Sequence, residues 1–187
     1  MSSPSEFWTW FADNAERLHA APGEALVDEV YDRLIEVDDR LGIEVSAGPT
    51  ASGERELIIT AYALREAIPV ARALAEQAPP LAGWKVIGLR PGRGFGFTFR
   101  NDDGEFQGTD IRFVALSRPG EPAHVKLLLP VALDSLPEGE RQQLGWQMLN
   151  AGLGELLAAQ IDELDVAGTG GSDDAGEPIE RLAGWLG

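Results

Sequence analysis

The chain contains no cysteine, and this absence excludes several kinds of chemistry at once. Disulfide scaffolds, zinc ribbons, catalytic thiols and thiol-based redox switches all depend on cysteine. A cysteine-free chain also fits a reducing compartment. Apolar residues make up 44% of the sequence, so a hydrophobic core of ordinary size is expected to supply the stability.

Long apolar runs are absent as well. No stretch approaches the roughly 18 consecutive apolar residues that a membrane helix needs. The first six residues, Met1–Glu6, show neither the basic nor the apolar region of a signal peptide. We therefore expect a cytoplasmic protein that does not enter a membrane.

Basic residues are scarce: 15 lysines and arginines stand against 31 acids, which gives a formal charge of −16. Such a chain repels phosphate backbones, which argues against nucleic acid as a partner. The acidity lies in residues 1–83 and 127–187, whereas residues 84–126 are slightly basic. A ligand site for an anion would be expected in this basic middle.

Two helices are predicted at the N-terminus, over residues 4–20 and 24–41. Ser3 and Glu6 have the spacing of a capping box, with Pro4 at the first helical position between them. Apolar residues then recur at helical spacing through both segments. Gly42 is expected to end the second helix.

The rest of the chain predicts an α+β fold with a mixed sheet. Helices are expected over 66–78 and 135–158, and strands over 43–47, 57–61, 84–89, 95–99, 111–116, 125–131 and 161–166. Short connections make the second and third strands a parallel pair joined by a helix. The order of elements indicates a duplicated β-β-α-β arrangement.

Three segments are expected along the chain. Residues 1–166 are predicted to form a single domain. The Gly, Ser and Asp composition of 167–177 predicts a flexible linker. Residues 178–187 are predicted to be a short C-terminal segment that docks as a helix.

A glycine-rich run covers residues 90–96 and alternates glycine with other residues. A dinucleotide-binding loop must open a helix, but here the chain continues as a strand. A P-loop would need a following Lys-Ser or Lys-Thr, which is absent. The run is therefore interpreted as a loop that enters an edge strand.

Arginines gather in the basic middle of the chain, at Arg90, Arg93, Arg100 and Arg112. Guanidinium groups bind carboxylates and phosphates through paired hydrogen bonds, so these residues are candidates for holding a small anion. The alternative, which the excess of acids favours, is that they form internal or surface ion pairs.

Glu155 is a charge on an otherwise apolar helix face, and it is a candidate partner for one of these arginines. It is also a candidate acid or base, although the sequence indicates no second carboxylate for it. Together with the tryptophan that opens a buried-looking strand, the candidate ligand-binding residues are Trp84, Arg90, Arg93, Arg100 and Glu155.

Aromatic residues cluster near the N-terminus. A core-facing stripe accounts for Phe7, Trp8 and Phe11, whereas Trp10 falls off that stripe. An exposed tryptophan would indicate a contact surface, because tryptophan is common at interface hot spots. The alternative is that a neighbouring loop covers it. The candidate interface residues are Trp8, Trp10 and Phe11.

Signatures of metal binding and catalysis are missing. Neither His19 nor His124 lies in a metal-binding frame, and no serine lies in a nucleophile elbow. Three acids at 162, 163 and 165 are more typical of a solvated strand face than of a metal site. We predict no metal and no cofactor, we identify no catalytic residue, and we favour a protein that is not an enzyme.

Several motifs occur in a recognisable order: F-W-x-W-F at 7–11, E-L-I-I-T-A at 56–61, A-P-x-L-x-G-W-K-V-I at 78–87 and L-G-E at 153–155. This set resembles a family of uncharacterised bacterial proteins. The resemblance implies a bacterial source and a stand-alone α+β domain. No activity is known for that family, so the resemblance implies no catalytic residue.

The sequence leaves two hypotheses for function. The first is a non-enzymatic interaction or regulatory module with a protein partner or a second copy of itself. The second is a protein or enzyme that binds a small anion through the arginines of the β-rich middle.

Overall fold

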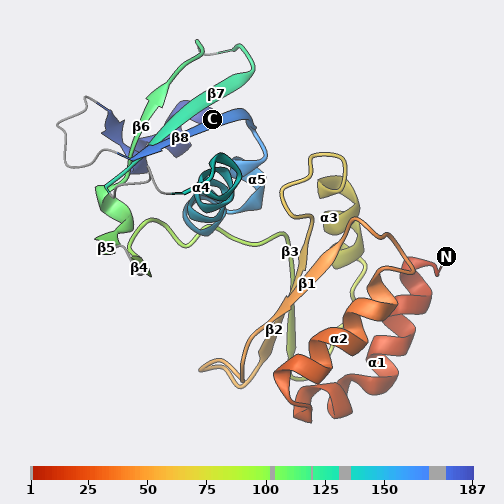
Figure 1. Cartoon of the computed structure of the whole chain (residues 1–187). Helices are drawn as coiled ribbons and strands as arrows, with labels where there is room; N and C mark the ends of the chain where they lie inside the picture. Colours follow the sequence, from red (N-terminus) through yellow and green to blue (C-terminus); the bar gives the residue numbers. More distant parts are fainter. Residues whose placement is uncertain (1, 102–103, 119, 131–135, 169–175) are drawn as a thin grey trace. The chain divides into compact units, whose positions relative to one another are not determined.

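Two compact units divide the chain, Met1–Arg90 (unit 1) and Pro91–Gly187 (unit 2). A computed structural model describes residues 2–101, 104–118, 120–130, 136–168 and 176–187 (Figure 1). Each unit combines helices with small sheets, so the predicted α+β class is confirmed. The prediction that 1–166 acts as a single domain stays a prediction.

Unit 1 begins with two helices, α1 (Pro4–Ala20) and α2 (Gly23–Leu34). The capping box of α1 is confirmed: the Glu6 amide donates to Ser3 Oγ at 3.3 Å, and the Ser3 amide donates to Glu6 Oε2 at 2.6 Å. The expected end of the second helix at 41 is wrong. The amides of residues 37 and 38 both donate to the Leu34 carbonyl and close a turn that leads into the sheet.

The sheet of unit 1 has the order β1-β2-β3, formed by β1 (Gly42–Val45), β2 (Arg55–Thr60) and β3 (Trp84–Gly88). The first pair is antiparallel and the second is parallel. Helix α3 (Ile68–Glu76) joins the parallel strands, as predicted. A Cβ added at Gly88 would lie 2.9 Å from that of Ala75, so α3 packs closely on β3.

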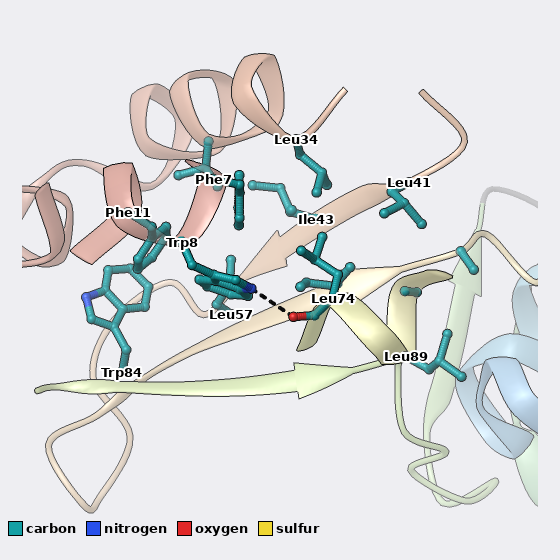
Figure 2. Packing of buried hydrophobic residues seen from close by; sticks show 14 of the residues in the cluster. Phe7, Trp8, Phe11, Leu34, Leu41, Ile43, Leu57, Leu74, Trp84 and Leu89 are labelled. Carbon is teal, nitrogen blue, oxygen red and sulfur yellow. Dashed lines mark hydrogen bonds between the residues drawn. The ribbon is translucent and has the colours of Figure 1, made fainter. Parts of the chain in front are cut away.

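The core of unit 1 is built around the aromatic residues of α1 (Figure 2). Trp8 is buried, and its indole nitrogen donates to the Leu74 carbonyl of α3 at 2.8 Å. Trp84 is buried too, and its indole nitrogen donates to the Ala15 carbonyl of α1 at 3.0 Å. These two bonds attach α1 to the parallel pair and its helix.

Unit 2 holds two sheets. A hairpin pairs β4 (Thr98–Asn101) with β5 (Gly104–Gln107). A second sheet has the order β8-β7-β6-β9 and is formed by β6 (Arg112–Ala115), β7 (Ala123–Leu129), β8 (Ile161–Gly168) and β9 (Glu177–Pro178). A short 3₁₀ turn, Gly108–Asp110, links the two sheets.

The main sheet of unit 2 repeats the topology of unit 1. Strands β6 and β7 are antiparallel, β7 and β8 are parallel, and helices α4 (Glu138–Leu153) and α5 (Glu155–Ala158) connect the parallel pair. A side chain at Gly145 would overlap that of Val166, so α4 packs directly on β8. The duplicated β-β-α-β arrangement is thereby confirmed.

Two elements of unit 2 differ from the prediction. The strand expected at 95–99 lies at 98–101, because Phe95 is used for packing and its ring fills the space beside Gly152 of α4. The single helix expected over 135–158 is interrupted at Gly154, whose φ of 78° is incompatible with a continuous helix. Ser135, its expected cap, lies outside the described residues.

The C-terminal segment packs within unit 2. A 3₁₀ turn (Ile179–Arg181) and α6 (Leu182–Leu186) bury Ile179 and Leu182 completely. Of the predicted linker, residues 169–175 lie outside the described part of the chain. None of the helices in the described part is long and apolar enough to cross a membrane.

Candidate functional site

The glycine-rich run caps the end of α4. The amides of Arg93 and Gly94 donate to the carbonyls of residues 151 and 152, each at 3.0 Å. A Cβ at Gly92 would lie 2.5 Å from the carbonyl of Leu153, so the close approach requires glycine. The loop therefore satisfies carbonyl groups that the helix end leaves open, which is a structural task.

The arginines of the basic middle are distributed over both units. In unit 1, Arg90 forms an ion pair with Glu44 of β1. In unit 2, Arg100 pairs with Glu105 across the β4–β5 hairpin. Ion pairing, the favoured alternative, is therefore realised for these two.

Two further arginines of the basic middle belong to unit 2. Arg112 donates to the Gly176 carbonyl at 3.0 Å. Arg93 is exposed, and its side chain has no ion pair within the described part of the chain. These two side chains lie on the surface of unit 2, and their assignment to an anion site remains a prediction.

The remaining candidate ligand residues are both buried. Trp84 packs edge-on against Phe11 and His19, with ring centroids 5.2 and 5.7 Å apart, and the Arg55 guanidinium lies over its ring. It is a central core residue of unit 1. Glu155 begins α5 in unit 2 and is completely buried. Their assignment to a ligand site remains a prediction.

The aromatic residues of α1 separate into two groups. Trp8 and Phe11 are buried in the core. Trp10 is half-buried and packs beside Phe7, while the guanidinium of Arg33 on α2 lies 5.5 Å above its ring. A side chain of α2 therefore covers part of Trp10. The interface hypothesis for these residues remains a prediction.

A histidine lies between two carboxylates on the main sheet of unit 2. His124 of β7 faces two residues of β8: its Nδ1 lies 3.3 Å from Glu163 Oε2, and its Nε2 lies 3.1 Å from Asp165 Oδ2. The carboxylates lie on different nitrogens of the ring. No group of three metal-binding side chains occurs among the described residues.

A pocket of about 390 Å³ lies beside this cluster in unit 2. It is formed where the first turns of α4 meet β7, β8 and the end of β6. Its described lining contains two cations, two anions, one amide and two aliphatic side chains: Lys126, Arg141, Glu138, Asp165, Gln142, Leu116 and Val166. We call this space the anion pocket.

Neither cation of the anion pocket has an ion pair with a described residue. Within the part of the chain that the structure describes, no carboxylate oxygen lies within 4.0 Å of Lys126 Nζ or of the Arg141 guanidinium. The Nε of Arg141 is buried and has no hydrogen-bond partner. Buried polar groups are usually paired, so this nitrogen is a donor that the described part of the protein leaves available.

The sequence analysis did not identify Lys126 or Arg141 as candidate ligand-binding residues. Lys126 carries a usable signal, because it is a charge inside the apolar strand Val125–Leu129. Arg141 has no such signal, since it is one of several polar residues in the first turns of α4. The two residues belong to different elements, β7 and α4, and only the structure shows that they line one pocket.

The chain was compared with family models, with curated proteins and with solved structures. None of the three comparisons contains a match. The likeness of its motifs to a bacterial family therefore stays a resemblance.

Proposed function

We propose that the protein is a non-enzymatic ligand-binding module that holds a small anion in the anion pocket of unit 2. The observation that carries the proposal is the pair of cations, Lys126 and Arg141, which line one pocket without a carboxylate partner among the described residues. Other arginines of unit 2, such as Arg93, also lack an ion pair among the described residues, so the proposal depends on two such cations lining the same pocket.

The lining indicates the kind of molecule. A planar guanidinium and an ammonium together favour a carboxylate or a phosphate. Glu138, Asp165 and Gln142 offer acceptors at the same pocket, so a ligand that also bears hydroxyl or amine donors is favoured. The pocket volume of about 390 Å³ is that of a small-molecule site. The strong net negative charge of the protein disfavours larger polyanions.

The proposal is tested by thermal-shift screening followed by calorimetry with two sets of ligands, hydroxylated or aminated carboxylates and their phosphate counterparts. A ligand at a hundredfold excess over Kd stabilises the folded state by about 2.7 kcal/mol. Lys126→Gln and Arg141→Met should each weaken binding roughly ten- to a hundredfold, since each removes a charge-assisted hydrogen bond.

Two matched variants serve as controls. Lys85→Gln removes a lysine that unit 1 already pairs with Glu56, and Arg181→Met removes an arginine that is paired with Glu177. Both should bind the ligand like the natural protein. The proposal is wrong if no ligand of either set raises the melting temperature, or if Lys126→Gln and Arg141→Met bind as well as the controls.

A further inference from the structure

The described lining of the anion pocket comes mainly from one helix and one strand pair, and each of them contributes one cation and one carboxylate. On α4, Glu138, Arg141 and Gln142 have the spacing i, i+3 and i+4, which places them on one face of the helix. On the sheet, Lys126 of β7 lies opposite Asp165 of β8 in the parallel register. The pocket therefore presents both signs of charge from the helix and from the sheet.

Opposite charges at these two spacings form ion pairs elsewhere in the chain. On α2 and the turn after it, Arg33 Nη1 lies 3.9 Å from Glu36 Oε2 at the i, i+3 spacing. In the sheet of unit 1, Lys85 Nζ lies 2.9 Å from Glu56 Oε1 across the parallel strands β3 and β2. Among the residues that the structure describes, neither the helix pair nor the strand pair of the anion pocket forms an ion pair. Both signs of charge are therefore available to a ligand.

The two carboxylates of the pocket differ in what already contacts them. Asp165 Oδ2 lies 3.1 Å from His124 Nε2, within hydrogen-bond distance. The side chain of Glu138 is exposed, and it makes no hydrogen bond or ion pair within the described ranges of the chain. Glu138 is therefore the carboxylate that a ligand can engage without displacing a described partner.

We infer that the ligand of the anion pocket is zwitterionic and that Glu138 determines this specificity; the inference rests on the proposed function. The carboxylate or phosphate of the ligand binds Lys126 and Arg141, and an ammonium group of the same ligand donates to Glu138. With two cations and two carboxylates in the described lining, a ligand that is only an anion would bring its charge near two like charges. An ammonium group offsets this repulsion, whereas a hydroxyl group does not.

The test uses pairs of ligands that differ only in an ammonium or a hydroxyl group. The pairs are alanine and lactate, aspartate and malate, and the phosphate esters of ethanolamine and ethylene glycol. Calorimetry measures the Kd of each ligand for the whole chain. We expect the ammonium member of at least one pair to bind about tenfold more tightly, since a hydrogen bond between two charged groups is stronger than one from a neutral hydroxyl.

Glu138→Gln keeps the size of the side chain and removes its charge. In this variant the ammonium member should bind about tenfold more weakly, whereas the hydroxyl member should bind at least as tightly as it does to the natural protein. Glu140→Gln is the matched control, because it removes a second glutamate from the first turn of α4 that is not part of the described pocket lining. It should keep the preference for the ammonium member.

The results separate this inference from the proposed function. An unchanged preference in Glu138→Gln, or an equal weakening of both members of a pair, would overturn the inference. If sulfate binds through Lys126 and Arg141 but no ammonium member binds more tightly than its hydroxyl partner, the proposed function stands and the inference is wrong. If neither sulfate nor any member of the pairs binds, both are wrong.

Discussion

Replacing Arg141 by methionine should make the unliganded protein more stable while it weakens anion binding. In the structure, the Nε of Arg141 is buried without a partner, and no described carboxylate neutralises the guanidinium. An unsatisfied buried donor costs about 1–3 kcal/mol. Arg141 as a whole is only half-buried, so part of this cost is relieved by water.

Methionine keeps the length of the apolar stem and removes the polar head. We therefore expect Arg141→Met to raise the free energy of unfolding of unit 2 by about 0.5–1.5 kcal/mol, the lower part of the range for an unsatisfied donor. Ligand sites often carry such a cost, because groups arranged for a ligand are unsatisfied without it.

The assay is urea denaturation of the unliganded protein, followed by the NMR signals of unit 2 so that the two units are not averaged. Arg181→Met is the control, since Arg181 is exposed and paired with Glu177, and it should change stability by less than about 0.5 kcal/mol. A loss of more than about 1 kcal/mol in Arg141→Met would show that the side chain has a structural task, and it would refute the reasoning.

Three other results are expected. Gly145→Ala should destabilise unit 2 by about 1–3 kcal/mol, because the added methyl overlaps a side chain of β8. Gly139→Ala, where the added methyl meets no other atom, should stabilise unit 2 by about 0.5–1 kcal/mol. Thermal denaturation compares the melting temperatures of the two variants. Trp84→Phe should cost unit 1 about 1–3 kcal/mol in urea, since it removes a buried hydrogen bond to α1 and part of the packed ring. Side-chain hydrogen bonds from Arg17 and Arg40 lower the pKa of Glu29 and of Asp38, respectively. The two ionised carboxylates therefore stabilise the fold above their usual pKa values of 4.5 and 3.8, and this stabilisation is lost as the pH falls through the lowered pKa values of the folded state. Carboxyl NMR titration should find both midpoints below 4.5 and 3.8, respectively.

The fold was predictable where local signals dominate. The capping box between Ser3 and Glu6, which are three residues apart, defines the start of α1. The order of helices and strands was enough to indicate the duplicated β-β-α-β topology. The end of α2 was not predictable in this way. Leu41 continues the apolar stripe of the helix, but it reaches the core from a turn rather than from a helix.

The candidate site was less predictable than the fold, because it depends on contacts between distant residues. The arginines near residue 90 are conspicuous in sequence, yet Arg90 and Arg100 are engaged by glutamates. Lys126 and Arg141 come from different elements, β7 and α4, and line the same pocket. Asp165 lies opposite Lys126 in the register of β7 and β8, yet no ion pair between them occurs among the described residues.

The central claim is that Lys126 and Arg141 bind an anion in unit 2. The most direct measurement is an NMR titration of the ¹⁵N-labelled protein with sulfate. We predict saturable shifts at the amides of β7, β8 and the first turns of α4, lost in the double variant Lys126→Gln/Arg141→Met and retained in Lys85→Gln. Shifts that do not saturate, or that persist in the double variant, would contradict the claim.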